Sequence, residues 1–418
     1  MVKGIFVILD GVADESCSVL GGKTPLESAR TSNLDFFASN GEVDYCFPIA
    51  EGVAPQSSSG VVSLLGADFR DVSRGVLEAV GAGVTLREGD LAFRCNFATI
   101  DNLNSLHLID RRAGRTLTTK EAYALAKSVN TKVKLPFAFE LIPTIGHRAV
   151  LVFRGGFSAN ISNVDPAYDS GLSVPGVHNN ISLSQPYDDS SAAKLASDLL
   201  NTFIRKSYVV LANHPVNLAR EKKGLFPANF ILCRDPGRAP LAVRHLKGSW
   251  RGFGYMPLEL GIIRAFGMKS SSFIYPSMDS IDSYEHLEKV LHLAIKNAII
   301  MLRTYASSVD YFYIHFKETD IPGHDNKPRE KVKLIEILDR EFFSFLKEFL
   351  AEHPARVLVT ADHTTSCRTK SHTAHPVPVL FYDSSSLKNC GRRFIERDGL
   401  MGEMIMGRKL LEKTLFMK

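Results

Sequence analysis

Short apolar runs and longer amphipathic runs alternate at both ends of the chain. Residues 5–9 are apolar, short and rich in β-branched side chains, which predicts a buried strand that ends at the turn signal Asp10-Gly11. Toward the other end, the pattern predicts a helix over 285–305, a strand over 309–316, a helix over about 328–350 and a strand over 355–361. Strands that alternate with helices favour an α/β lobe with a mainly parallel sheet.

The middle of the chain has a different pattern. From about residue 70 to 240 it is rich in Gly, Asn, Asp and Ser and carries only short apolar runs, such as 93–100 and 148–153. We therefore predict an inserted α+β lobe over 70–240, placed between the two halves of an α/β lobe that is formed by 1–69 and 241–418.

The composition is that of an ordinary globular protein. Over 418 residues, hydrophobic side chains make up 45% and charged side chains 23%, which excludes a disordered or fibrous chain. The formal net charge of +5 is a weak bias, no long block of Lys and Arg occurs, and the single Trp offers little surface for base stacking. These features argue against nucleic-acid binding, whereas a mild positive excess suits a small anionic substrate.

Cysteine use and hydropathy predict a cytoplasmic protein. The six cysteines are far apart and none forms a C-x-x-C pair, unlike those of a disulfide scaffold or a zinc ribbon. The first apolar run is too short for a signal peptide, and no stretch approaches the roughly 18 apolar residues that span a bilayer. We expect reduced cysteines and no membrane partner; the oligomeric state is left open.

Acidic and imidazole side chains follow the predicted strands. Ligands of open α/β sheets bind outside the carboxyl ends of strands, so these positions are candidates for a site. Alone, each has an ordinary explanation, such as an Asp-Gly turn, a surface pair or a helix cap. Together they form a set of oxygen and imidazole ligands that divalent transition metals favour: Asp10, Asp320, His324, Asp362, His363 and His372. Because one such ion needs about four ligands, this set predicts two ions.

A hydroxyl that could complete this site lies in the stretch 55–61, Pro-Gln-Ser-Ser-Ser-Gly-Val. Its small residues would allow a close approach to a metal or a phosphate, although an ordinary polar loop has the same composition. Two cations beside a serine suit phosphoryl transfer, because they neutralise phosphate oxygens and lower the pKa of the hydroxyl.

Arginines in the middle lobe could hold the phosphate and carboxylate groups of a substrate. The guanidinium fork matches the geometry of both groups. The candidates are Arg94, Arg111, Arg112 and Arg115. An ordinary surface role is the alternative for one or two of them.

Several long stretches resemble the archaeal-type, 2,3-bisphosphoglycerate-independent phosphoglycerate mutases, a branch of the alkaline phosphatase superfamily. They cover most of the chain and are distinctive: 8–11, 20–27, 93–99, 110–115, 317–325 and 361–378. The resemblance implies an isomerase of glycolysis and gluconeogenesis that interconverts 3-phosphoglycerate and 2-phosphoglycerate. It also implies an alkaline-phosphatase-like, metal-binding lobe with an inserted transferase lobe that binds the substrate, and a substrate position in the cleft between the lobes.

The resemblance assigns roles to single residues. It makes Ser57 the nucleophile that accepts the phosphoryl group. It places one metal among Asp10, Ser57, Asp362 and His363, and the other among Asp320, His324 and His372. The family usually uses manganese or a similar ion, with zinc, cobalt and magnesium as the alternatives.

The sequence departs from the family pattern at two places. Relatives carry Gly-Ser-Asp-Thr-Ala-His around the nucleophile, whereas residues 56–61 here read Gln-Ser-Ser-Ser-Gly-Val, without the carboxylate and the imidazole. A catalytic lysine is also expected near Gly248-Ser249-Trp250, where Lys247 is the nearest candidate. Two alternatives therefore stand beside the mutase: a phosphotransferase or phosphatase for another small phosphate ester, and a metal-binding protein that has lost catalysis.

Overall fold

Two units make up the protein. The computed structural model describes residues 2–169, 172–173, 179–241, 243, 245–276, 283–414 and 416. One unit is discontinuous in sequence and comprises Met1–Arg70 and Val243–Lys418, and the other is an inserted unit, Asp71–Ala242.

The discontinuous unit is built on an eight-stranded sheet with the order β11-β10-β12-β1-β13-β16-β2-β17. The strands are β1 (Gly4–Leu9), β2 (Glu42–Phe47), β10 (Trp250–Phe253), β11 (Lys269–Ser271), β12 (Tyr311–Phe316), β13 (Arg356–Thr360), β16 (Val377–Asp383) and β17 (Met404–Met406). The five strands from β11 to β13 run parallel, and β16 runs antiparallel to both its neighbours. The predicted α/β class with a mainly parallel sheet is confirmed.

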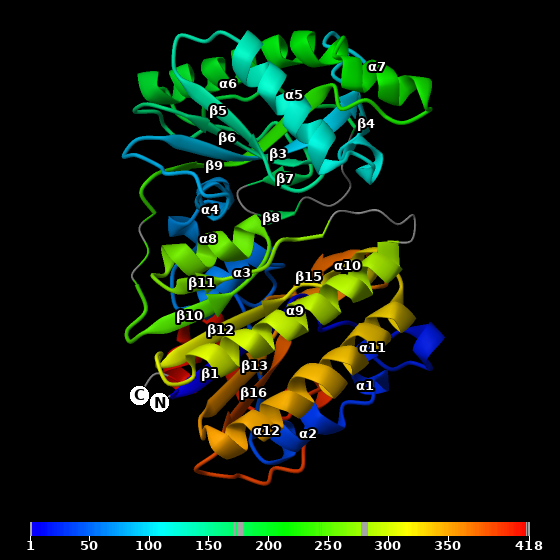
Figure 1. Ribbon diagram of the computed structural model, residues 1–418, viewed down its shortest axis with the longest axis vertical. Coiled ribbons are helices and arrows are strands. Elements are labelled where there is room, and N and C mark those ends of the chain that lie inside the picture. The colour runs from blue at the N-terminus through cyan, green and yellow to red at the C-terminus, as the bar shows by residue number, and fades with distance from the viewer. Residues whose placement is uncertain are drawn as a thin grey trace. The chain divides into compact units, whose positions relative to one another are not determined.

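Helices cover this sheet, and α9, α11 and α12 lie across one face of it (Figure 1). The helices of the unit are α1 (Pro25–Ser28), α2 (Ser32–Ser39), α3 (Ser57–Leu64), α8 (Pro257–Ala265), α9 (Ser283–Tyr305), α10 (Asp320–His324), α11 (Pro328–Ile337), α12 (Ser344–Glu352), α13 (Glu396–Gly399) and α14 (Leu410–Lys413). The helix predicted over 328–350 is α11 and α12, which a π-helical turn at Leu338–Phe343 joins. Because helices cover the sheet, β1 and β12 are buried along their whole length, which explains their nearly continuous apolar sequence.

The inserted unit contains a five-stranded antiparallel sheet with the order β4-β3-β6-β5, in which β9 also pairs with β3. Its strands are β3 (Leu91–Ile100), β4 (Leu108–Asp110), β5 (Phe139–Pro143), β6 (Arg148–Phe153) and β9 (Phe230–Arg238), besides the short pair β7 (Tyr168–Asp169) and β8 (Leu172–Ser173). Its helices are α4 (Arg74–Gly81), α5 (Thr119–Lys132), α6 (Ser191–Ala212) and α7 (Pro215–Lys222).

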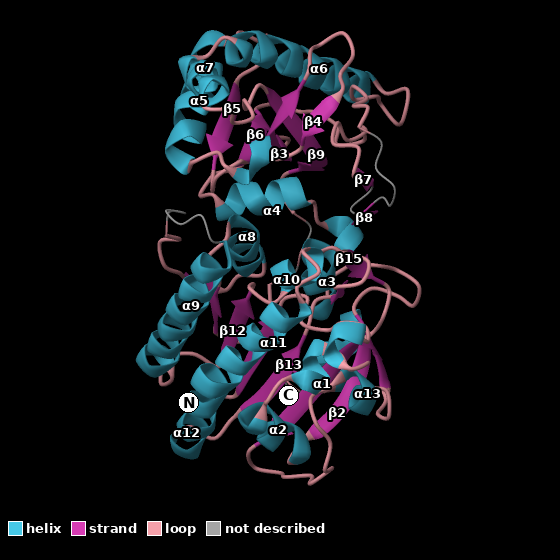
Figure 2. Ribbon diagram, turned by 90° about the vertical axis from the view of Figure 1, so that its right-hand side faces the viewer, coloured by secondary structure: helices cyan, strands magenta, loops and turns pink. Residues whose placement is uncertain are grey.

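Alternation along β3 gives this sheet two different faces. Phe93 and Phe97 belong to the larger core, to which α5 and α6 contribute, whereas Ala92 packs with Val76 of α4 on the opposite face. Figure 2 shows α5, α6 and α7 on one side of the sheet and α4 on the other. Since successive side chains of a strand point to opposite faces, Arg94 lies on the face that α4 covers. In neither unit is a described helix both long and apolar enough to cross a membrane.

A buried lysine ties α11 to the loop that follows β1. The side chain of Lys331 is fully buried, and its ammonium donates to a carboxylate oxygen of Asp14 at 2.9 Å. It also donates to the carbonyl oxygens of Ala13 at 3.2 Å and Thr365 at 2.9 Å. One cation thus holds the loop after β1 and the small hairpin of β14 (Thr364–Ser366) and β15 (Ser371–Thr373) against the same helix.

We expect Lys331→Met to lower the free energy of unfolding by about 3–5 kcal/mol, because it leaves the buried Asp14 carboxylate without its cation. Urea denaturation followed by circular dichroism measures the change. Lys333→Met is the matched control on the same helix, since Lys333 pairs with Glu288 at the surface and should contribute less than about 1 kcal/mol. Equal effects of the two substitutions would contradict this account.

Candidate active site

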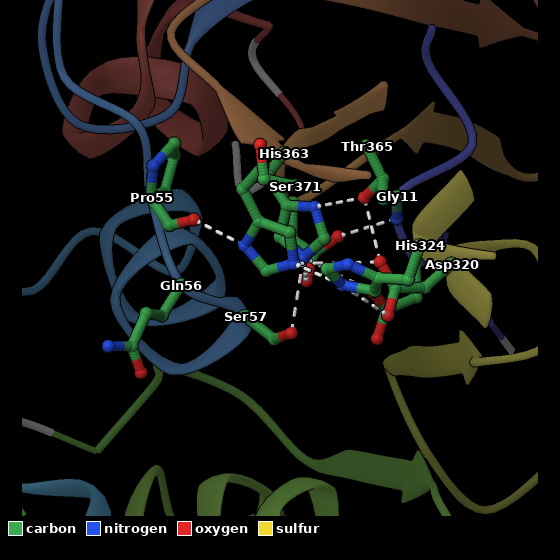
Figure 3. Close-up of polar contacts among 12 residues, drawn as sticks. Gly11, Pro55, Gln56, Ser57, Asp320, His324, His363, Thr365 and Ser371 are labelled. Carbon is green, nitrogen blue, oxygen red and sulfur yellow. Dashed lines mark hydrogen bonds and ion pairs between the residues drawn. The ribbon is translucent and has the colours of Figure 1, made fainter. Parts of the chain in front are cut away.

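The carboxyl ends of three neighbouring parallel strands bring the predicted ligands together. β1 pairs with β12 on one side and β13 on the other. Asp10 follows β1, Asp320 opens α10 just after β12, and Asp362-His363 follow β13. The hairpin strand β15 then carries His372 back to the same place. Figure 3 shows the Ser57 hydroxyl pointing toward His363, with Asp320, His324 and Thr365 beside them.

One group of ligand atoms surrounds the Nε2 atom of His363. The distances from this atom are 3.3 Å to Oδ1 of Asp10, 3.2 Å to Oδ2 of Asp362 and 3.1 Å to Oγ of Ser57. Both carboxylate oxygens are buried and have no hydrogen-bond partner among the described residues. Unsatisfied buried oxygens are costly, so this donor set fits a cation that all four atoms could coordinate.

A second group lies beside it and consists of Asp320, His324 and His372. The Nε2 atoms of the two histidines are 3.2 Å apart, and they lie 3.4 Å and 3.6 Å from the two carboxylate oxygens of Asp320. The side chains of Asp320, His363 and His372 offer ligand atoms within 4.8 Å of one another, so the two groups are adjacent. The second group likewise fits a divalent ion.

Hydrogen bonds orient the two histidines of the second group. Nδ1 of His372 lies 2.7 Å from the carbonyl oxygen of Pro55, and Nδ1 of His324 lies 3.0 Å from that of Lys370. A carbonyl oxygen only accepts, so each Nδ1 carries the hydrogen and each Nε2 is left for a metal. Such outer hydrogen bonds fix the ring orientation and raise the basicity of a histidine ligand.

Thr365 connects the two groups. Its hydroxyl donates to Oδ1 of Asp320 at 2.7 Å and lies 2.9 Å from Nδ1 of His363, from which it can accept. Gly11 leaves room for the Thr365 hydroxyl between the two groups. It has φ +56°, and a Cβ atom at this position would lie 2.3 Å from that hydroxyl. Its backbone N–H donates to Oδ1 of Asp362 at 3.0 Å, which leaves Oδ2 to face His363. The predicted turn at Asp10-Gly11 is therefore part of the site.

Charge within the site favours bound cations. Burial lowers the pKa of His363, but the carboxylates of Asp362 and Asp10 outweigh it and raise this pKa to about 10. Burial alone would raise the pKa of Asp320, yet His324 and His372 hold it well below its usual range. The Asp320 carboxylate thus stays ionised and attracts positive charge, and a metal ion on Nε2 of His363 would take the place of a proton.

Helix α3 places Ser57 at this centre. Ser57 is its first residue, and the backbone N–H of Gln56 donates to Oγ of Ser59 at 3.0 Å, which stabilises the helix start. Gly60 allows the helix to approach the Asp362 loop, since a Cβ atom there would lie 2.2 Å from the Asp362 carbonyl oxygen. The N–H groups at the start of a helix favour an anion, and here they lie close to the hydroxyl.

Lys317 lies beside this centre, whereas Lys247, the nearest candidate in the sequence, does not. Lys247 is exposed and precedes β10, at the opposite edge of the sheet from the carboxyl ends of the strands. The Lys317 ammonium instead contacts Oδ2 of Asp10 and lies 3.0 Å from Oε1 of Glu259. Burial lowers the pKa of Lys317, but Asp10 and Glu259 raise it above its usual range, so the ammonium stays charged.

Sequence reasoning missed Glu259 and His315, which also surround Asp10. Nε2 of His315 lies 3.2 Å from Oδ2 of Asp10. His315 lies inside the apolar strand β12, and Glu259 lies in α8 among apolar residues. A charged or imidazole group inside an apolar run was the signal that could have drawn attention to them.

The four arginines lie in the inserted unit, where Arg94 and Arg111 pair with carboxylates. Nη1 of Arg94 lies 2.6 Å from Oε2 of Glu78 in α4, and both side chains are buried. Burial lowers the pKa of Arg94 to about 9, although Glu78 opposes this. Nη2 of Arg111 donates to both oxygens of Asp165, at 2.6 and 2.7 Å. The carboxylates of Glu78 and Asp165 had not been identified from the sequence.

Positive charge gathers around His147 in the same unit. Burial lowers the pKa of His147 well below its usual value, and nearby arginines lower it further: Arg148, Arg94, Arg112 and Arg115. Three of the four predicted arginines therefore act on one location, together with Arg148, which the sequence had not singled out. Such a cluster favours anions.

A parallel α/β sheet with carboxylates and histidines beyond its strand ends, next to a serine at the start of a helix, is typical of metal-dependent phosphoryl-transfer enzymes. The family model described as 2,3-bisphosphoglycerate-independent phosphoglycerate mutase matches residues 38–217. Curated members from Methanopyrus kandleri and Aeropyrum pernix are each 37% identical; the alignments cover 93% and 99% of this chain and 89% and 99% of theirs. The chain therefore belongs to the 2,3-bisphosphoglycerate-independent phosphoglycerate mutase family, which confirms the resemblance.

Solved structures agree with this assignment. The PH0037 protein from Pyrococcus horikoshii has a TM-score of 0.75 at 26% identity, with 99% of this chain and 96% of that chain covered. The cofactor-independent phosphoglycerate mutase from Thermoplasma acidophilum has a TM-score of 0.60 at 27% identity, with 99% of both chains covered. The fold is thus shared with this family over nearly its full length.

We expect Gly60→Ala to destabilise the protein by about 1–3 kcal/mol, because the new methyl group collides with the backbone of Asp362. The same collision should move Ser57 away from His363. Thermal unfolding measures the first effect. Gly156→Ala is the control, since a Cβ atom there meets nothing within 4 Å. A Gly60→Ala protein that melts at the control temperature would exclude the close packing described here.

Proposed function

We propose that this protein is a metal-dependent phosphoglycerate mutase that interconverts 3-phosphoglycerate and 2-phosphoglycerate through a phosphoserine at Ser57. The observation that carries this proposal is the short distance of 3.1 Å between the Ser57 hydroxyl and His363, within a cluster of carboxylate and imidazole groups. Family membership supports the substrate, and the geometry supports the chemistry.

We assign two divalent ions to the two groups of ligand atoms. One ion would be held by Asp10, Ser57, Asp362 and His363, and the other by Asp320, His324 and His372. Mixed oxygen and imidazole ligands suit manganese, which we propose as the physiological ion, and they also accept zinc, cobalt or magnesium. When bound, these ions neutralise phosphate oxygens and lower the pKa of the Ser57 hydroxyl.

The reaction then needs two transfers. The Ser57 hydroxyl loses its proton, and its oxygen bonds to phosphorus as the bond from phosphorus to the substrate oxygen breaks. That substrate oxygen takes up a proton, which leaves phosphoserine and glycerate. In the second transfer the other hydroxyl of glycerate loses its proton, and its oxygen bonds to phosphorus as the bond from phosphorus to the Ser57 oxygen breaks. The Ser57 oxygen then takes up a proton, which restores the hydroxyl. The N–H groups at the start of α3 stabilise the phosphoryl group in both steps.

Glycerate must stay bound between the two transfers, and we assign this task to the arginines of the inserted unit. Arg112 and Arg115, whose charges act on His147 together with Arg94 and Arg148, favour its carboxylate. The Glu78–Arg94 and Asp165–Arg111 pairs hold two further guanidinium groups in fixed positions. Exclusion of water during this interval prevents hydrolysis of the phosphoserine.

We expect Ser57→Ala to lower mutase turnover at least about a thousandfold, because it removes the nucleophile. A coupled assay with enolase, which consumes 2-phosphoglycerate, measures turnover, and metal analysis should show that ions still bind. Ser63→Ala, in the same helix but near its other end, should keep most of the activity. Normal turnover of Ser57→Ala would refute the assignment of Ser57.

Removal of metal should abolish turnover reversibly. A chelator strips the carboxylate and histidine ligands of their ions, and we expect manganese to restore the rate, with zinc, cobalt and magnesium compared at equal concentration. The measurement is the same coupled assay, with metal content determined before and after treatment. Full activity in a protein shown to be metal-free would contradict the metal-dependent mechanism.

A phosphatase or phosphotransferase for another small ester is the second candidate. Ser58 and Ser59 stand where relatives place a carboxylate and a threonine, and this change could alter how water or the acceptor is held. Incubation with several phosphate esters separates the two functions. Release of inorganic phosphate without isomer would favour hydrolysis, whereas 2-phosphoglycerate without free phosphate favours the mutase.

A further inference from the structure

A third group of ligand atoms adjoins the centre described above and shares Asp10 with it. The side chains of Asp10, Glu259 and His315 are all buried and offer ligand atoms within 4.8 Å of one another. Glu259 is 0% exposed, and neither of its carboxylate oxygens has a hydrogen-bond partner among the described residues. A buried carboxylate in this state needs a cation, because its charge has lost the solvation of water.

The cation that this structure supplies is the side chain of Lys317. Its ammonium contacts Oδ2 of Asp10 and lies 3.0 Å from Oε1 of Glu259. No other ion pair of Glu259 occurs in the described part of the chain. One ammonium thus neutralises two buried carboxylates, one just after β1 and the other in α8.

We propose that the Lys317 ammonium occupies a position in which Asp10, Glu259 and His315 would otherwise bind a further divalent ion. The proposal rests on the two-ion centre under "Proposed function". Asp10 is the residue common to both: its Oδ1 faces His363, while its Oδ2 faces Lys317 and His315. Lys317 is therefore also a positioning residue, which fixes the orientation in which Asp10 presents Oδ1.

Neighbouring hydrogen bonds support a fixed Asp10. The Tyr313 hydroxyl lies 2.9 Å from Nδ1 of His315, and Nε2 of the same ring lies 3.2 Å from Oδ2 of Asp10. When Tyr313 donates to Nδ1, the hydrogen of the ring is on Nε2 and points at Asp10. The Thr319 hydroxyl donates to the backbone carbonyl of Asp10 at 2.5 Å. Asp10 is held at its side chain and its backbone, and Lys317 supplies the charge.

The test removes the ammonium and counts ions. Wild type and Lys317→Ala are equilibrated with Mn²⁺, dialysed, and analysed for manganese per chain. We expect two ions in wild type and three in Lys317→Ala, because Asp10, Glu259 and His315 then coordinate Mn²⁺ in place of the lysine. Adding Glu259→Gln to Lys317→Ala removes one of the two charges and should return the count to two. Lys327→Met, an exposed lysine just after α10, should leave it at two.

Melting of the metal-free proteins gives a second readout. Lys317→Ala should melt at a lower temperature than wild type, since it leaves two buried carboxylates without a cation, and the Glu259→Gln addition should recover most of this loss. A folded Lys317→Ala protein that binds no additional Mn²⁺ would overturn the proposal. The proposal would also be overturned if adding Glu259→Gln to Lys317→Ala did not raise the melting temperature.

The manganese counts distinguish a failure of the Lys317 proposal from a failure of the proposed two-ion centre. If wild type binds no Mn²⁺, the proposed function fails, whereas the third-ion proposal is judged by the difference between Lys317→Ala and wild type. If wild type binds two ions and the difference is zero, only the role of Lys317 fails.

Discussion

Buried negative charge at the carboxyl ends of β12, β1 and β13 is the constraint on which this structure depends. Parallel pairing brings these strand ends to one edge, and the aspartates that follow them lose most of their contact with water. Carboxylates in such surroundings are stable only beside positive charge. The protein meets this need locally with lysines and histidines, and leaves unsatisfied oxygens at the points where its family would bind divalent ions. The same electrostatic demand therefore organises both folding and chemistry.

The sequence predicted most of this edge because its ligands follow recognisable strands. Apolar runs located β1, β12 and β13, and the general position of ligands in α/β sheets then identified Asp10, Asp320 and Asp362. Glu259 could not be found in this way. It lies in α8, which follows β10, and only the sheet order brings that helix next to Asp10. The apolar pattern of the sequence indicates which residues follow a strand, but it does not indicate which strands are neighbours in the sheet.

The inserted unit was predicted less completely, for a related reason. The apolar runs indicated β3 and β6, but the partners of the arginines come from elements far away in sequence, such as Glu78 from α4. Around the nucleophile, the sequence showed that residues 56–61 differ from the pattern of relatives, but it did not show how this difference affects the position of Ser57. In the structure, Gln56 and Ser59 bond to each other and start α3, so the altered residues still place Ser57 beside His363. Local hydrogen bonds thus keep Ser57 in place although the motif has changed. The negative charge of the carboxylate that relatives carry is not replaced, because Ser58 has only a hydroxyl.

The discontinuity of the larger unit has a consequence for how the protein is made. β1 is the first strand of the chain, yet its two partners are β12 and β13, and the hydrogen bond between Gly11 and Asp362 spans 351 positions. On the ribosome, β1 must wait until the inserted unit and most of the remaining chain have emerged. During that interval an apolar strand with two unpaired edges is exposed, which slows folding and invites aggregation. The inserted unit, whose contacts are more local, can fold first and shorten the effective loop that β1 has to close.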